Sequence, residues 1–254
     1  MTNLSPSPDE SLDILTRDWR IFQLKRGHRF STDDLLTAWT AIKAYPEAEE
    51  VLDIGSGIGS VGLLTLSGIH PNAKMTSIEV QEVSYKLACK TVDYNGLSDR
   101  VDLNHGDLRD HEVLLDNGKK WLLITGSPPY IPLGKGVCSP HPQRAGARME
   151  LKGSVYDYCE TASARLATDG IFCFVHSARD LRPELAISDS GLTLLHRQDV
   201  IFREGLEPTI ALFICGWKGE REDPPNLVVR DINGEWTDDY HKMRDEMGVP
   251  NLRQ

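Results

Sequence analysis

Two short loops carry the residues whose types and spacing could do chemistry. The first is Asp53-Ile54-Gly55-Ser56-Gly57-Ile58-Gly59, a glycine-rich turn that ends the apolar run Val51 to Ile54. The second is Ser127-Pro128-Pro129-Tyr130, which follows the apolar run Trp121 to Ile124. Glycines at such a turn permit backbone angles and a close ligand approach that side chains would block, so the first loop predicts a nucleotide-type ligand. Ser60 stands where the dinucleotide fingerprint has its third glycine, so the spacing is better described as GxGxG.

Three carboxylates lie at the ends of successive strand-like runs: Asp53, Glu79 and Asp107. Because open α/β sheets bind ligands at the carboxyl ends of their strands, we expect these side chains at one edge. Glu79 can accept hydrogen bonds from both ribose hydroxyls, Asp53 can serve the methionine end of S-adenosylmethionine (SAM), and Asp107 can take its adenine amino group. SAM carries a sulfonium cation and no phosphate, so an acidic rim favours it over ATP. The alternative is that the carboxylates merely cap local turns.

The second loop fits methyl transfer to a planar nitrogen. Two consecutive prolines fix their backbone angles and remove two amide donors, which leaves a rigid turn rich in carbonyl acceptors. An exocyclic or amide nitrogen is a poor nucleophile because its lone pair is conjugated. Hydrogen bonds from its NH2 group to Ser127 and to the Pro128 carbonyl would help to pyramidalise it, and Tyr130 can stack on the planar substrate. An ordinary Pro-Pro loop after a strand is the alternative.

The apolar periodicity predicts the elements that must position these loops. A hairpin is expected over residues 19–30, followed by a helix that Ser31 or Thr32 caps and that ends before Pro46. Strand-like runs then alternate with helical ones, which indicates a Rossmann-like α/β fold with a mostly parallel, seven-stranded sheet and an antiparallel edge pair. The expected strands cover 51–54, 75–80, 101–104, 121–124, 170–175, 192–195 with 200–202, and 209–215, and the expected helices cover 61–66, 82–94 and 155–166.

Length and composition favour one enzyme domain. The chain has 254 residues, of which 40% are hydrophobic and 26% charged, as in ordinary globular enzymes. We expect a flexible N-terminal tail over 1–17, the catalytic domain over 18–218 and a peripheral C-terminal tail over 219–254. No apolar run approaches the roughly 18 residues that span a bilayer. The five scattered cysteines fit a reducing compartment, so a cytoplasmic location is predicted.

The net charge of −10 argues against nonspecific binding of nucleic acid, because Lys and Arg drive phosphate binding. A local basic face is still compatible with this total, and scattered solvated charges are the alternative. The sequence indicates no oligomeric state. The candidate basic clusters are Lys25 to Arg29, Arg144 with Arg148 and Lys152, and Arg179 with Arg182.

Metal binding and a nucleophilic thiol are not predicted. His105 and His141 lie in loops without partners at metal-ligand spacing, so they are interpreted as solvated side chains. Cys138 lies near the second loop, but direct methyl transfer needs no covalent intermediate.

The two loops together resemble those of amino-group methyltransferases, whose signature is Asn, Asp or Ser, then Pro-Pro, then Tyr, Phe or Trp. Within this group the chain resembles the bacterial enzymes that methylate N6 of an adenine beside the anticodon of a valine tRNA. The resemblance implies that Thr32 and Asp33 touch the cofactor and that Arg148 and Glu150 shape the substrate mouth. A helix cap and a surface ion pair are the alternative roles. The resemblance runs from about Phe22 to Trp217 and includes the stretches 30–39, 147–154 and, near the end, 231–237.

The leading hypothesis is therefore SAM-dependent methylation of the N6 amino group of an adenine in tRNA, by direct transfer to a flipped or loop-exposed base. A protein glutamine amide and a small molecule are the alternative acceptors. A catalytically inactive, SAM-binding partner subunit is the remaining alternative, because Ser127 stands where the family typically carries Asn.

Overall fold

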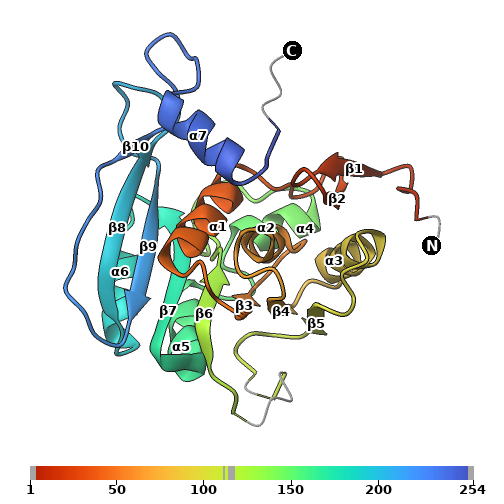
Figure 1. The fold of residues 1–254 in the computed structure, drawn as a ribbon, viewed down its shortest axis with the longest axis horizontal. Helices are drawn as coiled ribbons and strands as arrows, with labels where there is room; N and C mark the ends of the chain where they lie inside the picture. The colour runs from red at the N-terminus through yellow and green to blue at the C-terminus, as the bar shows by residue number, and fades with distance from the viewer. Residues whose placement is uncertain (1–3, 111, 114–117, 251–254) are drawn as a thin grey trace.

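A computed structural model describes residues 4–110, 112–113 and 118–250. Within these residues a two-stranded hairpin and an eight-stranded sheet are surrounded by helices (Figure 1). The strands are β1 (Glu10–Ile14), β2 (Arg20–Leu24), β3 (Glu50–Ile54), β4 (Lys74–Glu79), β5 (Val101–His105), β6 (Trp121–Gly126), β7 (Leu166–Ser177), β8 (Thr193–Ile201), β9 (Ile210–Gly216) and β10 (Leu227–Val228). The helices are α1 (Thr32–Ala44), α2 (Ser60–Gly68), α3 (Glu82–Tyr94), α4 (Pro142–Arg148), α5 (Val155–Arg165), α6 (Arg182–Asp189) and α7 (Asp238–Glu246).

The large sheet has the order β10-β8-β9-β7-β6-β3-β4-β5. Among the described strands, β9 alone runs against its neighbours, and every other pair in this sheet is parallel. The predicted Rossmann-like, mostly parallel fold is therefore confirmed, with β8 and β9 as the antiparallel pair. The predicted strand number of seven is wrong by one, since β10 pairs beside β8. Two residues are too few for sequence periodicity to reveal a strand.

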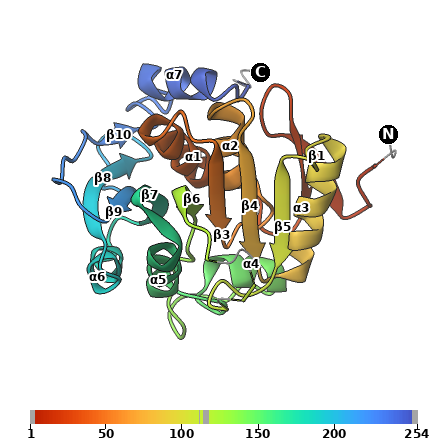
Figure 2. The same cartoon turned by 60° about the horizontal axis from the view of Figure 1, so that its bottom comes forward.

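Two hydrophobic cores cover the two faces of the sheet. Successive strand residues point to opposite faces, so Val51 joins one core while Leu52 joins the other. Around β7, β8 and β9, Figure 2 shows α1 and α7 on one side of the sheet and α5 and α6 on the other. On the α5 and α6 side the rings of Phe172, Phe174 and Phe213 stack in a row at 4.9 Å centroid spacing.

The N-terminal hairpin lies earlier in the chain than expected. Residues 20–24 form its second strand, β2, and its first strand, β1, falls within the segment 1–17 that we expected to be a flexible tail. Tertiary contacts that the sequence pattern does not reveal fix β1. Glu10, on β1, accepts hydrogen bonds from Lys90 Nζ on α3 at 2.6 and 2.8 Å, and the Phe22 amide donates to Thr91 Oγ1 at 3.0 Å.

The C-terminal segment 219–254, expected to be peripheral, contributes to the main core over its described part. Tyr240, Met243 and Met247 are buried beside α1, at helical spacing along and just after α7. Trp39 Nε1 also donates to Glu246 Oε2 at 3.2 Å, which ties α7 to α1. Charged residues dominate this segment, and three apolar positions were too weak a pattern to predict a buried helix. Along the described residues, no helix combines the length and apolar character needed to cross a membrane.

Candidate active site

A cavity of about 540 Å³ opens at the carboxyl ends of β3, β4 and β6. The glycine loop and the Ser-Pro-Pro-Tyr loop both line it, together with the start of α1 and residues of α4. In Figure 2, α4 lies at the edge toward which β3 and β4 point. The structure thus brings the two predicted loops together at one site. Of the predicted site residues, those that line the cavity are Asp33, Asp53, Gly55, Gly57, Glu79, Ser127, Pro128, Pro129 and Tyr130.

The glycine loop is a tight turn that leaves room for a ligand. Gly55 has φ +62°, and a Cβ there would lie 1.8 Å from the Tyr158 hydroxyl oxygen. Gly57 has φ +58°, and a Cβ there would meet nothing within 4 Å, so it borders open space. Gly59 does not line the cavity, but its amide donates to the Ser56 carbonyl at 2.8 Å and closes the turn.

Asp53 and Glu79 are buried and hydrogen-bonded to the backbone of the site. Asp53 accepts from Thr125 Oγ1 at 2.8 Å and from the Gly62 amide at 3.0 Å. Glu79 accepts from the Gly57 amide at 2.7 Å and from the Gln81 amide at 2.5 Å. Burial raises the pKa of both carboxyls, to about 7 for Asp53. Each oxygen of Glu79 uses one of its two acceptor positions, so the ribose-binding role predicted for it remains available.

The structure does not bring two other predicted residues into the cavity. Asp107 turns to Arg109, with Oδ1 2.9 Å from Nε and Oδ2 2.6 Å from a terminal guanidinium nitrogen. This ion pair lowers the pKa of Asp107. Gly106 and Leu108, its neighbours, line the cavity instead. Thr32 Oγ1 lies 3.4 Å from the hydroxyl of Tyr240, so it faces α7.

Tyr130 is held from two sides. Its hydroxyl donates a hydrogen bond to Asp33 Oδ2 at 3.0 Å, in the first turn of α1. Its ring packs against His176, near the end of β7, with ring centroids 5.1 Å apart. Burial raises the pKa of Tyr130 well above its usual range, and the Asp33 carboxylate adds to this effect. The phenol therefore keeps its proton and remains the donor.

The first turn of α1 is fixed by its own sequence. Ser31 caps the helix as predicted, and its amide donates to Asp34 Oδ2 at 2.8 Å. The other carboxylate oxygen, Asp34 Oδ1, accepts from Ser60 Oγ on α2 at 3.0 Å. Two successive aspartates thus connect α1 to both loops, Asp33 through Tyr130 and Asp34 through the helix that follows the glycine turn.

Tyr158 is a site residue that the sequence analysis missed. It lies on α5, is buried, and lines the cavity with its hydroxyl beside Gly55. Its side chain also packs beside Gly126, where a Cβ would lie 3.1 Å from Tyr158 Cδ1. In the sequence Tyr158 belongs to the apolar face of a predicted helix, which is typical of an ordinary core residue. Only the fold reveals that this part of the face borders a cavity.

Another missed residue, Gln143, positions α4. Its Oε1 accepts from the His28 amide at 3.0 Å, and its Nε2 donates to Ser84 Oγ on α3 at 3.1 Å. These bonds hold α4 against both the segment before α1 and the start of α3. Helix α4 is not among the helices that the apolar periodicity predicts.

The outer part of the cavity is basic. Arg144, Arg148 and Lys152 line it, and all three are exposed. In the part of the chain that the structure describes, none of them forms an ion pair. By contrast, Glu150 pairs with Arg182 at 2.6 Å rather than with Arg148. Three cations from one predicted cluster therefore remain available around the opening, and we name them the basic rim.

The inner part of the cavity fits SAM. The open space over Gly57 is where a ligand would approach the backbone. Ser56 Oγ lines the same cavity and is buried without a hydrogen-bond partner among the described residues. The inner side chains Asp33, Asp53 and Glu79 are carboxyls, which suit the sulfonium and ammonium charges of SAM. Over the described residues, no group of three or more His, Cys, Asp or Glu side chains could hold a metal ion.

The raised pKa of Asp53 predicts a pH dependence of stability. The folded carboxyl titrates at about 7, above its ordinary value of 3.8. Between these values the folded chain binds more protons than the unfolded one, so the free energy of unfolding falls as pH rises. Asp53→Asn should shrink the difference in unfolding free energy between about pH 5 and about pH 8 by roughly 2 kcal/mol, measured by urea denaturation. The exposed control Asp99→Asn should leave the difference unchanged, and an equal change in both variants would contradict this assignment.

Comparison with known proteins finds relatives that match most of the chain. No family model matches the chain. The tRNA1(Val) (adenine(37)-N6)-methyltransferase of Shewanella amazonensis is 29% identical over 216 residues, which cover 84% of this chain and 88% of that protein. The proteins of the same name from Haemophilus influenzae and Pasteurella multocida are 24% and 25% identical, over 89% and 81% of this chain and 94% and 83% of their own lengths.

Solved structures confirm the fold. A predicted O-methyltransferase from Agrobacterium tumefaciens superposes with a TM-score of 0.64 at 16% identity, covering 86% of this chain and 98% of that one. A precorrin-6y C5,15-methyltransferase from Geobacter metallireducens gives a TM-score of 0.52 at 14% identity, over 78% and 94%. The chain therefore has the Rossmann-like fold of these methyltransferases, and over most of its length it is similar to the proteins named tRNA1(Val) (adenine(37)-N6)-methyltransferase.

Proposed function

We propose that this enzyme transfers a methyl group from SAM to the N6 amino group of an adenine in a tRNA. The printed names of its homologues support this substrate, and so does the Ser-Pro-Pro-Tyr loop beside the inner acidic cavity. The observation that carries the proposal is the division of charge within one cavity. Buried carboxyls and the exposed cations of the basic rim line the same cavity.

The basic rim favours RNA over the alternative acceptors. In a chain of net charge −10, three exposed cations without ion-pair partners in the described residues line one cavity. Phosphate contacts from Lys and Arg position a nucleic acid, whereas contacts with the bases select a particular nucleotide. A small metabolite or a glutamine side chain requires no such cluster of cations. We also propose a cytoplasmic location, where tRNA is found, and a single domain that includes β1 and α7.

The residues of the second loop bind and orient the amine in this proposal. When bound, SAM supplies an electrophilic methyl group. Ser127 Oγ and the Pro128 carbonyl accept hydrogen bonds from the N6 amino group, which draws its lone pair out of conjugation. The Tyr130 ring stacks on the adenine, and Pro129 keeps the turn rigid. Because the Tyr130 hydroxyl is engaged by Asp33, the ring has a fixed position before the base arrives.

The first loop and the acidic residues bind SAM in this proposal. Gly55 and Gly57 allow the close approach of the cofactor, Glu79 accepts the ribose hydroxyls, and Asp33 and Asp53 face its positive charges. Thr32 and Gly59 do not contact SAM directly in this proposal. Thr32 contacts Tyr240, and Gly59 closes the turn of the glycine loop. Asp107 reaches the adenine amino group only if its ion pair with Arg109 opens, so Gly106 and Leu108 are the nearer contacts.

The direct test of this function is methylation of RNA. Purified protein is incubated with isotopically methyl-labelled SAM and total small RNA, and the digested nucleosides are analysed by mass spectrometry. We expect label in N6-methyladenosine, and a loss of roughly tenfold or more for Tyr130→Ala because a stacking partner of the base is removed. If SAM binding is confirmed but no nucleoside carries label, an RNA substrate is excluded and protein or metabolite acceptors take its place.

The role of the basic rim predicts a change in salt dependence. In a triple variant, Arg144→Ala with Arg148→Ala and Lys152→Ala, the slope of log Kd for tRNA against log salt should fall by about 2–3, because up to three phosphate contacts are removed.

Its matched control is the double variant Lys119→Ala with Lys218→Ala. These lysines lie just before β6 and just after β9, at the opposite edge of the sheet from the cavity. The control should bind tRNA with an unchanged slope. An unchanged slope in the triple variant, or an equal decrease in the control, would show that the rim does not contact phosphates.

A further inference from the structure

His176 is a buried histidine behind the reaction loop. It is 0% exposed, and it lies one residue before the end of β7, opposite Ala211 on β9. One face of its ring meets Tyr130, with centroids 5.1 Å apart and the planes inclined at 55°. His176 does not line the cavity, so any effect that it has on the substrate passes through the loop.

The two nitrogens of this ring have no hydrogen-bond partner among the described residues. A buried polar group without a partner costs about 1–3 kcal/mol of stability. Phenylalanine would offer Tyr130 a comparable aromatic face without that cost. The histidine at this position therefore suggests that a ring nitrogen is used in a state of the loop other than the one described.

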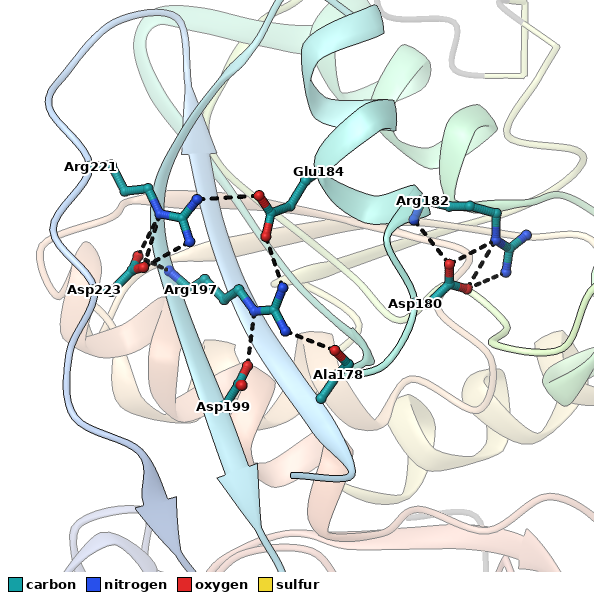
Figure 3. A network of polar contacts seen from close by, with 8 residues as sticks. All are labelled: Ala178, Asp180, Arg182, Glu184, Arg197, Asp199, Arg221 and Asp223. Atoms are coloured by element: carbon teal, nitrogen blue, oxygen red, sulfur yellow. Dashed lines mark hydrogen bonds and ion pairs between the residues drawn. The ribbon is translucent and has the colours of Figure 1, made fainter. Parts of the chain in front are cut away.

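The nearest carboxylate does not use the ring nitrogen. Asp180 Oδ2 lies 3.8 Å from His176 Nδ1, which is beyond hydrogen-bonding distance. Figure 3 shows Asp180 engaged instead by Arg182, whose Nε lies 3.0 Å from both carboxylate oxygens. Arg182 also contacts Glu150 Oε1 at 2.6 Å, and this further fixes it.

The turn that carries Asp180 is itself held in place. Just beyond it, Glu184 on α6 accepts hydrogen bonds from Arg197 at 2.8 Å and from Arg221 at 3.2 Å (Figure 3). Arg197 also donates to the Ala178 carbonyl at 2.8 Å, which secures the chain between β7 and α6. Asp180 is thus fixed away from the imidazole, and the backbone carbonyls of Pro129 and Ser177 are the other polar groups that act on the ring.

The imidazole is neutral at cellular pH. Burial lowers the pKa of His176 to about 4, and Arg182 acts in the same direction, whereas Asp180 and the carbonyls of Pro129 and Ser177 act against it. A neutral imidazole carries one N–H. That N–H is a hydrogen-bond donor beside a loop whose two prolines contribute carbonyl acceptors and no amide donors of their own.

From this geometry we infer that His176 is a positioning residue of the reaction loop: its N–H binds the Pro129 carbonyl when a planar acceptor base occupies the site, while its ring supports Tyr130. The inference rests on the proposed function for the identity of the base. In this arrangement the Pro128 carbonyl accepts a hydrogen bond from the amine, and the Pro129 carbonyl accepts one from His176. The N–H of His176 therefore fixes the orientation of the turn and, with it, the direction of the Pro128 carbonyl.

Two variants separate this role from ordinary packing. His176→Phe keeps an aromatic ring but removes the donor, and His176→Gln removes the ring but keeps an N–H. We expect His176→Phe to unfold at a temperature equal to or above that of the wild type, because a buried unpaired group is gone. Its single-turnover rate of methyl transfer should fall about tenfold at saturating SAM and tRNA. His176→Gln should recover at least part of that rate. A packing role predicts the opposite, with His176→Phe fully active and His176→Gln the weaker variant.

A readout independent of activity is hydrogen–deuterium exchange of the peptide over 124–134, measured with SAM and tRNA present. His176→Phe should leave this segment less protected than in the wild type. The control Val175→Ala, at the buried neighbour on β7, should lower the unfolding temperature without changing the rate or the protection. A His176→Phe variant with unchanged rate and protection would overturn the inference. If the wild type methylates no RNA, the proposed function falls, and exchange measured with SAM and free adenosine as the planar base still tests whether His176 orders the loop.

Discussion

The hydrogen bond from the Tyr130 hydroxyl to Asp33 is the interaction on which the site depends. It joins the reaction loop, at the end of β6, to the first residues of α1, which are far away in the sequence. Asp34, the next residue, is bonded to Ser60 at the start of α2. A hydrogen bond to a charged group contributes about 1.5–3 kcal/mol, so this acidic pair can hold both loops to one helix. Helix α1 thereby fixes the glycine loop and the Ser-Pro-Pro-Tyr loop relative to each other.

Acidic and basic side chains line the same cavity, and the net charge of the whole chain does not indicate this. The carboxyls Asp53 and Glu79 are buried at strand ends, where hydrogen bonds from backbone amides stabilise them and where parallel sheets place their ligands. The basic rim comes from α4 and the turn that follows it, a region attached by Gln143 rather than by the sheet. The buried carboxyls and the exposed cations of this cavity therefore come from different parts of the chain.

The sheet and the two loops could be predicted because each depends on local sequence. Apolar runs that end in Gly55 or lead to Pro128 mark strand ends, and strand ends of one parallel sheet meet at one edge. The other features depend on contacts between distant residues. Asp107 is turned away by Arg109, β10 has only two residues, and α7 buries Tyr240 against a helix more than 190 positions earlier. Tyr158 and His176 show no local signal, because a buried aromatic residue beside a cavity has the same sequence pattern as one in the core.

In the proposed function, Tyr130 and Asp33 act as one unit in aligning the acceptor. A double-mutant cycle of Tyr130→Phe and Asp33→Ala tests it most directly, with single-turnover methyl transfer to tRNA as the measurement. Each single change should slow transfer by roughly tenfold or more, and the double change should slow it no further than the larger single effect, since both remove the same hydrogen bond. If the two effects instead multiply, the residues act independently, and the hydrogen bond does not couple the cofactor helix to the reaction loop.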